Sequence, residues 1–375
     1  MKRILNQFLV FAGIWLLVFQ GRNLMAQSTG NPFTNLGPQL RASMIQGSIF
    51  IHDVSGRSLV YTVVRGEPAH LLGYDRISGK LLLDQPLPGA DGAWDMAYSP
   101  DGWLYVPGAS GSLFRHRPGT QEVENLGMAL QGETYVWSLT TGRNGEIFGA
   151  TYPGCRVFRY HPKDGFSDVG KGPLVPGENY VRTLAFHIKT GKLYAGIGSH
   201  ANLIELDPVT GQKKELLPAK YKSKEFVYGL ELVYNVKGGD RLMALLNSGQ
   251  TTLIYNLKTH KVEAELDSID MKTVLPDPGG KFVYVTSRSK LRRLDLTKPA
   301  EKPVYLGETG ASANAMGWSE DGQVLVLTYK GIVHRFNTAT HTGSQTALEI
   351  PGQPIPIQSI HYGPDNRIWM GGYLA

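Results

Sequence analysis

The sequence reads GETYVWSLTTGRNGEIFGATYPGCRVFRYHP from 132 to 162 and GENYVRTLAFHIKTGKLYAGIGSHANLIELDP from 177 to 208. Both stretches begin with the pattern Gly-Glu-x-Tyr-Val, and their starts lie 45 positions apart (177 minus 132). Self-similarity with such a period is typical of repeat architectures, in which each repeat is one supersecondary unit. The fold is therefore best predicted from the repeating unit.

The same unit recurs along most of the chain. It contains an apolar strand, a turn such as Ser99–Gly102 (SPDG), a second apolar strand, a Gly-rich loop, a third strand, a turn such as Asp207–Gly211 (DPVTG) and a fourth strand. In the third strands apolar and polar residues alternate, as in Phe158-Arg159-Tyr160, which is typical of a half-exposed sheet. The second strands are expected to begin near Ser58, Trp103, Glu146, Lys192, Arg241, Lys281, Gln323 and Arg367.

Four short antiparallel strands in every 40 to 49 residues predict an all-β fold, a β-propeller of four-stranded blades. Seven units are complete. An eighth supplies only two strands, at 356–365 and 367–375, so the count is compatible with seven or eight blades. Either this C-terminal pair closes a seven-bladed ring with the first unit, or the chain is truncated within a longer protein, and the second alternative is favoured slightly.

The N-terminus has the layout of a secretory signal peptide. Lys2 and Arg3 precede an apolar run, Phe8–Phe19, and Ala26 offers a small residue for cleavage. A membrane anchor would need about 20 apolar residues, more than this run contains. The protein is thus expected to be secreted or periplasmic. The expected organisation is a signal peptide at 1–26, a linker or strap at 27–47 and the propeller at 48–375.

Composition limits the range of partners. Without residues 1–26 the chain holds 35 Lys and Arg against 32 Asp and Glu, and this balance is no nucleic-acid signature. Cys155 is the only cysteine, so no intramolecular disulfide can form. The histidines show no metal-ligand spacing. We expect no cofactor or metal, no nucleic acid partner and no membrane contact after signal cleavage.

The turns resemble those of known propeller repeats. Asp75–Lys80 (DRISGK) and Asp207–Gln212 (DPVTGQ) are similar to the D-x-x-T-G-K turn of quinoprotein-like and lactonase-like (YVTN-type) repeats of bacterial secreted propellers. Ser99–Gly102 resembles the turn of the broad class related to tryptophan–aspartate repeats. The resemblance implies the fold over nearly all of the mature chain but no activity, because these turns are structural. Quinoprotein dehydrogenases would also have a vicinal disulfide, which one cysteine cannot provide.

Two columns of residues recur at loop positions that a propeller places on one face. The first column, at the start of the innermost strands, comprises Trp94, Trp137, Arg182, Tyr228, Lys272, Asn314 and Gln358. The second, between the second and third strands, comprises Ser110, Tyr152, His200, Asn247, Arg288, Tyr329 and Tyr373.

Aromatic rings can stack on the faces of sugars, and neighbouring Arg, Lys and Asn side chains can donate hydrogen bonds to their hydroxyl or carboxylate groups. The same combination suits other polar small ligands. The sequence therefore predicts a glycan or polar ligand at the funnel mouth, bound by Trp94, Trp137, Tyr228, Asn247, Lys272 and Arg288. The alternative is that the tryptophans only pack between blades.

A catalytic alternative uses Arg182, Tyr152 and His200. Arg182 would clamp a substrate carboxylate while Tyr152 or His200 takes the neighbouring proton, as in a polysaccharide lyase that cleaves uronates by β-elimination. The structural alternative makes His200 a surface residue and pairs Arg182 with Glu133 or Glu178. A third hypothesis is a non-catalytic interaction propeller, with further domains of the same polypeptide among its partners.

Overall fold

The computed structural model describes residues 34–373, apart from positions 109, 248–250, 268 and 271–272. Residues 40–375 form one compact unit and residues 1–39 another. The expected signal peptide and part of the expected linker lie outside the described residues. In the described part no helix is long and apolar enough to cross a membrane, and helical structure there is confined to one turn, η1 (Ala219–Tyr221).

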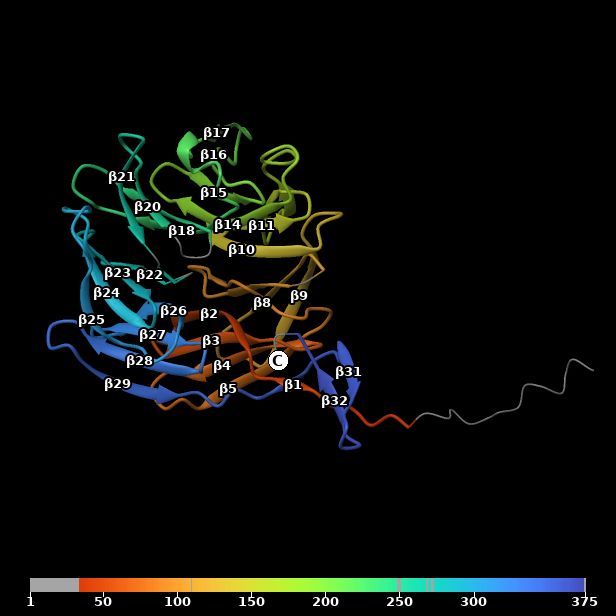
Figure 1. Cartoon of the computed structure of the whole chain (residues 1–375). Helices are drawn as coiled ribbons and strands as arrows, with labels where there is room; N and C mark the ends of the chain where they lie inside the picture. The colour runs from red at the N-terminus through yellow and green to blue at the C-terminus, as the bar shows by residue number, and fades with distance from the viewer. Residues whose placement is uncertain (1–33, 109, 248–250, 268, 271–272, 374–375) are drawn as a thin grey trace, which may run out of the picture. The chain divides into compact units, whose positions relative to one another are not determined.

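Seven four-stranded antiparallel sheets follow one another along the chain, each with its strands in sequence order (Figure 1). Blades 1 to 3 consist of β2 (Ile45–His52), β3 (Ser58–Val64), β4 (Ala69–Asp75) and β5 (Leu81–Leu87); β6 (Ala97–Tyr98), β7 (Leu104–Pro107), β8 (Ser112–His116) and β9 (Val123–Met128); and β10 (Tyr135–Thr141), β11 (Ile147–Tyr152), β12 (Val157–His161) and β13 (Gly165–Asp168).

Blades 4 to 7 continue in the same way. They consist of β14 (Tyr180–His187), β15 (Lys192–Gly198), β16 (Asn202–Leu206) and β17 (Lys213–Glu215); β18 (Val227–Val233), β19 (Arg241–Leu246), β20 (Thr251–Asn256) and β21 (Lys261–Asp267); β22 (Val274–Pro276), β23 (Phe282–Ser287), β24 (Lys290–Asp295) and β25 (Val304–Glu308); and β26 (Ala313–Trp318), β27 (Val324–Thr328), β28 (Ile332–Asn337) and β29 (Thr342–Ala347). The predicted β-propeller is confirmed, with seven blades.

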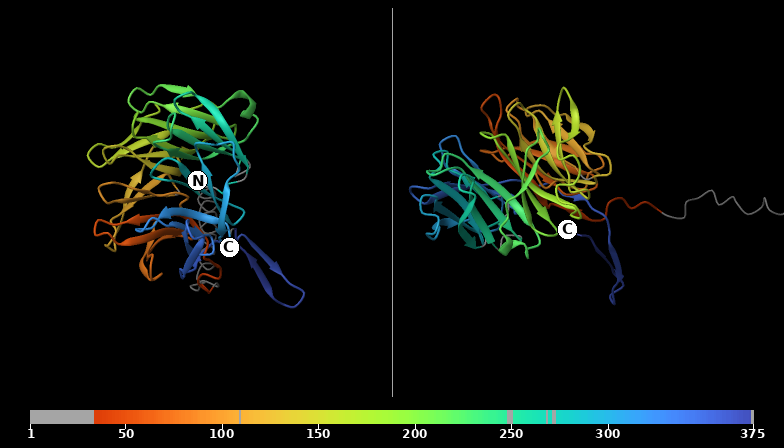
Figure 2. Two further views of the ribbon diagram at one scale, coloured as in Figure 1. Left: turned by 90° about the vertical axis from the view of Figure 1, so that its left-hand side faces the viewer. Right: turned by 90° about the horizontal axis from the view of Figure 1, so that it is seen from above.

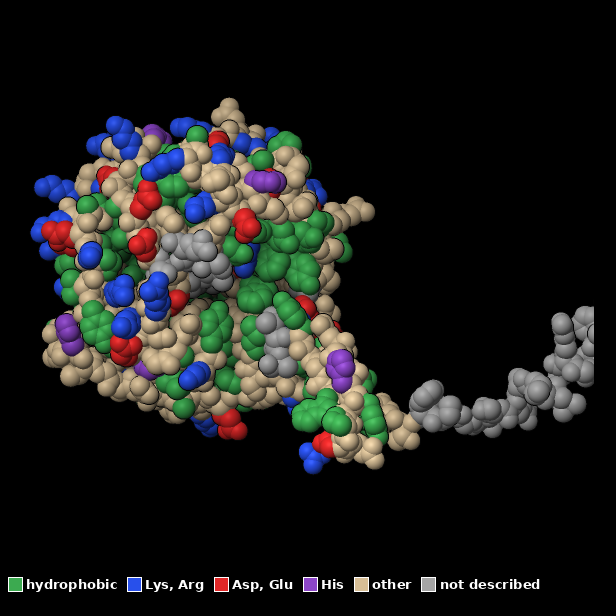
Figure 3. All heavy atoms as spheres, in the orientation of Figure 1, with side chains coloured by type: hydrophobic (Ala, Val, Ile, Leu, Met, Phe, Trp, Pro, Cys, Tyr) green, Lys and Arg blue, Asp and Glu red, His purple; other side chains and the backbone are tan. Residues whose placement is uncertain are grey.

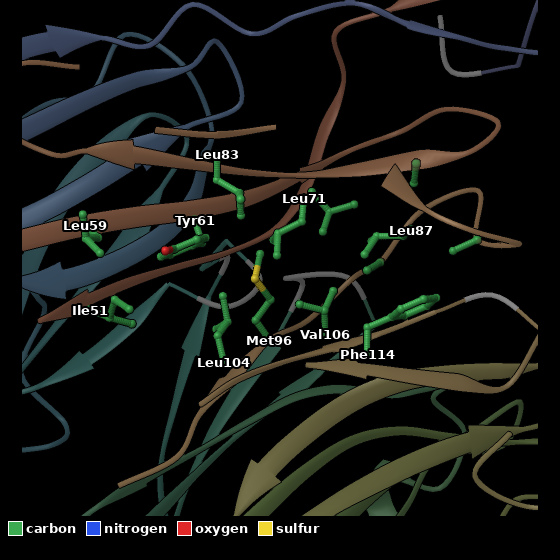
Figure 4. Close-up of a cluster of buried hydrophobic side chains, with 14 residues drawn as sticks. Ile51, Leu59, Tyr61, Leu71, Leu83, Leu87, Met96, Leu104, Val106 and Phe114 are labelled. Carbon is green, nitrogen blue, oxygen red and sulfur yellow. The ribbon is translucent and has the colours of Figure 1, made fainter. Parts of the chain in front are cut away.

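The core is divided among the gaps between blades. In the described part, seven clusters of buried apolar side chains each span two neighbouring blades. Between blades 1 and 2, Leu71 and Leu87 pack with Val106 and Phe114, as Figure 4 shows. Each fully buried side chain of this size contributes about 1.5–3 kcal/mol. The ring is therefore stabilised by sheet-to-sheet packing around its whole circumference.

The ring closes by packing of blade 7 on blade 1. Val60 and Tyr74 of blade 1 share one apolar cluster with Leu327 and Val333 of blade 7. The Tyr74 hydroxyl also donates a hydrogen bond to the backbone oxygen of Glu349 (2.8 Å). The proposed closure by the C-terminal strand pair is wrong, because blade 1 already has four strands of its own.

Two short ribbons lie outside the blades. β1 (Arg41–Ala42) pairs with β30 (Gln353–Pro354) and joins the two ends of the ring. β1 and the start of β2 fall within the segment predicted as a linker. β31 (Ser359–Tyr362) and β32 (Ile368–Gly371) form a hairpin that stands away from the ring in both views of Figure 2. The incomplete eighth unit is therefore no part of the ring.

Candidate functional site

The innermost strands of five blades contain a β-bulge near their start. The register shifts between Val136 and Ser138 in β10, and equivalent shifts occur in β2, β14, β18 and β26. A bulge leaves its extra residue outside the strand ladder and re-aims that side chain. In four blades the single extra residue belongs to the first predicted column, namely Trp137, Arg182, Tyr228 and Asn314.

A cavity of about 340 Å³ lies at the axis of the ring, because residues in or directly before the inner strands of all seven blades line it. Its polar lining includes Asp95, Ser138, Arg182, Glu231 and Asp270. Figure 3 shows that hydrophobic side chains gather on one side of this centre, over β10. The mouth of the channel is thus apolar on the side of blade 3 and polar along its wall.

Seven aromatic residues, here called the aromatic arc, form a continuous run of ring contacts across blades 2 to 5. Neighbouring ring centroids along the run lie 4.4 to 6.4 Å apart, distances typical of aromatic pairs. All seven side chains are partly exposed. The members are Trp94, Tyr135, Trp137, Tyr152, Tyr180, Phe226 and Tyr228.

Four members of the arc were predicted as site residues from the sequence: Trp94, Trp137, Tyr152 and Tyr228. Tyr135, Tyr180 and Phe226 were missed. Tyr135 and Tyr180 occupy the same position in the repeated Gly-Glu-x-Tyr-Val pattern, which indicated the repeat but not a site. Their rings contact Trp137 at 5.3 and 6.0 Å, so this repeated position also belongs to the site.

Arg182 lies between two rings of the arc. Its Cζ is 4.5 Å from the ring centroid of Trp137 and 5.4 Å from that of Tyr228, distances at which a cation is attracted to the aromatic face. Asp95, Tyr180 and Tyr329 are close enough for their charges to act on its guanidinium, but among the described residues no hydrogen bond contributes to its pKa. Burial lowers the pKa of Arg182 below its ordinary value, against the opposing effect of Tyr228 and Asp95.

The predicted ion pair of Arg182 with Glu133 or Glu178 is wrong. Glu178 accepts hydrogen bonds from the backbone and ring of His200. Glu133 lies 3.7 Å from Arg156 and accepts a hydrogen bond from the backbone N–H of Gly154. Both glutamates thus hold loops, and neither pairs with Arg182.

Tyr152 lies within the arc, whereas His200 stands apart from it. The Tyr152 ring is 4.4 Å from that of Tyr180. The His200 side chain is 83% exposed, its Nδ1 lies 2.7 Å from Glu178 Oε1, and no described ring contact links it to the arc. The structure therefore brings together two members of the predicted catalytic trio, Arg182 and Tyr152.

Asn247 and Arg288 are placed differently from each other. Asn247 Oδ1 accepts hydrogen bonds from the backbone N–H groups of Glu225 and Phe226, so it fixes the loop that carries Phe226 into the arc. Arg288 is exposed in the turn between β23 and β24. Lys272 lies outside the described residues.

In blades 1 and 7 the bulges of the innermost strands hold Gln46 and Asn314, and both side-chain amides are buried. Asn314 is buried and donates from Nδ2 to the backbone oxygen of Gln46 (2.6 Å), while Gln46 Oε1 accepts from the backbone of Ala93 (2.8 Å). These residues join neighbouring blades. Among the described residues, the aromatic part of the candidate site therefore lies in blades 2 to 5, whereas all seven blades contribute to the cavity.

Three carboxyl groups line the channel, namely those of Asp95, Glu231 and Asp270. Asp95 accepts hydrogen bonds from the backbone N–H groups of Met96 and Leu139, both at 3.0 Å. Burial, together with the negative charge of Asp95, raises the pKa of Glu231 to about 8. At neutral pH Glu231 therefore presents a protonated carboxyl group that can donate a hydrogen bond into the channel.

The described residues offer neither a metal site nor a reactive thiol. No group of three or more His, Cys, Asp or Glu among them could hold a metal ion. Cys155 is buried, and burial raises the pKa of its thiol to about 11, which keeps it protonated and unreactive.

No family model and no curated protein sequence matches the chain. Solved β-propellers share its fold. Virginiamycin B lyase from Staphylococcus aureus has 14% identity and a TM-score of 0.59, covering 76% of this chain and 92% of that one. Dihydro-heme d1 dehydrogenase NirN has 14% identity and a TM-score of 0.59 (83% and 68% covered), and the RRP9 WD40 repeats have 12% and 0.60 (78% and 88% covered). At these identities the likeness shows the fold alone.

Proposed function

We propose that the protein binds a polar small ligand at the channel mouth, and that a carbohydrate with a negatively charged group fits best. The observation that carries this proposal is the guanidinium of Arg182, which lies between Trp137 and Tyr228 and has no salt-bridge partner among the described residues. A guanidinium presents five donors in a fixed fork that matches a carboxylate, phosphate or sulfate.

The rest of the site supports a sugar-like ligand. The partly exposed rings of the aromatic arc offer apolar surface for the faces of pyranose rings. Asp95 and Glu231 line the channel wall and would accept or donate hydrogen bonds to hydroxyl groups. An aromatic rim with a few convergent polar groups is typical of small-molecule sites.

A glycan array with neutral and acidic oligosaccharides tests the proposal. The 375-residue protein should bind acidic glycans, and Arg182→Met should weaken that binding about 10- to 100-fold, because hydrogen bonds to charged groups contribute about 1.5–3 kcal/mol. Arg159→Met is the matched control, since Arg159 lies on β12 and pairs with the exposed Asp164. A wild-type protein that binds no glycan, or an unchanged array profile for Arg182→Met, would contradict the proposal.

A polysaccharide lyase is the second candidate. Tyr152 is in ring contact with Tyr180, and Tyr180 is close enough for the positive charge of Arg182 to act on its pKa. The other candidate base, His200, is paired with Glu178 and stands apart from the arc, so binding ranks first. Incubation with uronate polysaccharides would give an unsaturated product that absorbs in the ultraviolet if the lyase proposal holds.

Two further expectations from the sequence belong to this proposal. Membership of the quinoprotein-like or lactonase-like repeat type is supported by the DRISGK and DPVTGQ turns. Export is supported by the signal-like residues 1–26. N-terminal sequencing of the mature protein from the producing cell should begin at Gln27, and an intact Met1 would contradict export by cleavage.

A further inference from the structure

The hairpin β31–β32 has the backbone of the first two strands of a blade. Its turn is closed by a hydrogen bond from the Gly363 N–H to the Arg367 oxygen (2.8 Å). The equivalent bond runs from Ser99 to Trp103 in blade 2 (2.8 Å) and from Ser319 to Gln323 in blade 7 (2.9 Å). The hairpin is thus another copy of the repeating unit, and it lies outside a ring that is already closed.

Both faces of the hairpin carry apolar side chains that are open to solvent. Because residues paired across antiparallel strands share a face, Ile360 and Tyr362 lie on the same face as Ile368, and Trp369 lies on the other. Ile360, Tyr362, Ile368 and Trp369 are 63%, 73%, 60% and 59% exposed. Large exposed apolar patches mark surfaces that bind other molecules.

The equivalent strands within the ring are covered on both faces. Every described residue of β3, β19 and β27 is buried, because neighbouring blades pack against both sides of each sheet. The hairpin presents the same kind of residues without those neighbours. Its composition is therefore suited to burial between two sheets.

The outer edge of β32 is open as well. In each of the seven blades the second strand pairs with a third strand on this side, whereas β32 pairs with β31 alone. The strand, Ile368–Gly371, contains no Lys, no Pro and no bulge, which are the features that usually protect a free edge from pairing.

The base of the hairpin is anchored to the ring. The guanidinium of Arg65, which follows β3, lies 5.2 Å from the ring centroid of Tyr373. Within the hairpin, the Gln358 N–H donates to the Gly371 oxygen at 2.8 Å and closes its base. This attachment leaves the two strands projecting from the ring, where another domain can reach both faces.

We propose that β31–β32 is the first half of a blade outside this ring, and that a partner propeller-type domain completes it. The partner supplies an extended strand to the edge of β32 and an apolar sheet to each face. Strand addition of this kind draws affinity from main-chain hydrogen bonds and specificity from alternate side chains. The hairpin carries few charges, Asp365 and Arg367 in its turn, so the partner surface is apolar.

A second copy of the chain fits this surface less well. Two hairpins packed face to face would cover one face each and leave either the Trp369 face or the Ile360 face in solvent. The occupant must therefore cover more surface than another hairpin can.

Hydrogen exchange of the 375-residue protein with a strand-pair peptide tests the proposal. The probe is a synthetic peptide of residues 156–168 (RVFRYHPKDGFSD), which contains β12 and β13, the pair that completes blade 3. At millimolar peptide we expect exchange in 358–373 to slow at least fivefold. Ile368→Lys should abolish this protection, whereas Val209→Lys, at another exposed apolar residue that lies in a turn outside the hairpin, should leave it unchanged.

Three outcomes would overturn the proposal. The first is no slowing of exchange with the native peptide, and the second is equal slowing with a scrambled peptide. The third is protection of 358–373 that rises with protein concentration alone, together with a dimer in light scattering, because a second copy would then occupy the hairpin.

Discussion

The guanidinium of Arg182 lies over the indole of Trp137, with its Cζ 4.5 Å from the ring centroid. Both residues are the bulged positions of neighbouring inner strands, β14 and β10. The contact therefore joins two positions that the strand ladder leaves unpaired. The Trp137 ring is also stacked on that of Tyr135, with centroids 5.3 Å apart and an interplanar angle of 15°. The stacked indole therefore holds in place the guanidinium that we propose to bind the ligand.

Replacement of Arg182 by Met should leave the free protein as stable as before, or stabilise it by about 1 kcal/mol, because removal of a buried unpaired charge lowers a desolvation cost. Urea denaturation measures the free energy of unfolding. Arg156→Met is the matched control, since Arg156 pairs with Asp168 at 2.7 Å, and it should lose about 1–3 kcal/mol. Equal losses for the two variants would show that Arg182 has a structural partner.

Trp137→Phe should keep both stability and ligand affinity. The indole Nε1 is buried without a hydrogen-bond partner among the described residues, so a phenyl ring loses no hydrogen bond and still stacks on Tyr135. Trp137→Ala should lose about 2–3 kcal/mol and release Arg182 from its position. Thermal unfolding and glycan titration of both variants check this, and a Phe variant as weak as the Ala variant would assign a role to the indole N–H.

Gly198→Ala should displace the Phe226 ring and thereby disturb the aromatic arc. A Cβ at Gly198 would lie 1.9 Å from Cδ1 of Phe226, and the Phe226 ring contacts Tyr180 and Tyr228. We expect a loss of about 1–3 kcal/mol from overpacking and a weaker affinity for the ligand. Phe226→Leu in the same chain should restore part of the stability. A double-mutant cycle measures this coupling, and strictly additive losses would contradict it.

Glu231 should make stability fall as the pH rises. Its pKa is raised by burial from 4.5 to about 8, so between these values the folded protein holds a proton that the unfolded chain releases, and the free energy of unfolding decreases with pH. Glu231→Gln should be more stable than the wild type by about 1 kcal/mol at pH 8.5, discounted for partial solvent access. The two proteins should be equally stable near pH 4.5.

The control for this pH dependence is Glu301→Gln, at a glutamate whose side chain is 63% exposed. Its difference from the wild type should not change with pH. A Glu231→Gln variant with the same flat profile would show that the carboxyl group is ionised in the folded protein at neutral pH.

The repeat pattern predicted the blades well because turn and strand chemistry is local. The second strands begin within one residue of the predicted positions, for example at Leu104 for a predicted Trp103 and at Lys192 for Lys192. The bulged residues were also found from the sequence, since the same offset from each turn selects Trp137, Arg182 and Tyr228.

Long-range packing was less accessible from the sequence. The closure of the ring depends on contacts between blades 1 and 7, which are more than 240 residues apart in the chain, as for Arg76 and Glu320. Phe226 was missed because its place in the arc depends on Asn247 of a neighbouring loop and on the space left by Gly198. The single-sequence pattern carries no signal for either contact.

The bulges have a consequence for how such a protein can change over generations. A residue outside the ladder has no cross-strand partner to match, so its side chain can be exchanged while the hydrogen bonds of the blade stay as they are. In this chain the same backbone position already holds Trp137, Arg182, Tyr228 and Asn314 in different blades. Substitutions at one bulge at a time can therefore change the ligand selectivity, while the fold of the propeller stays the same.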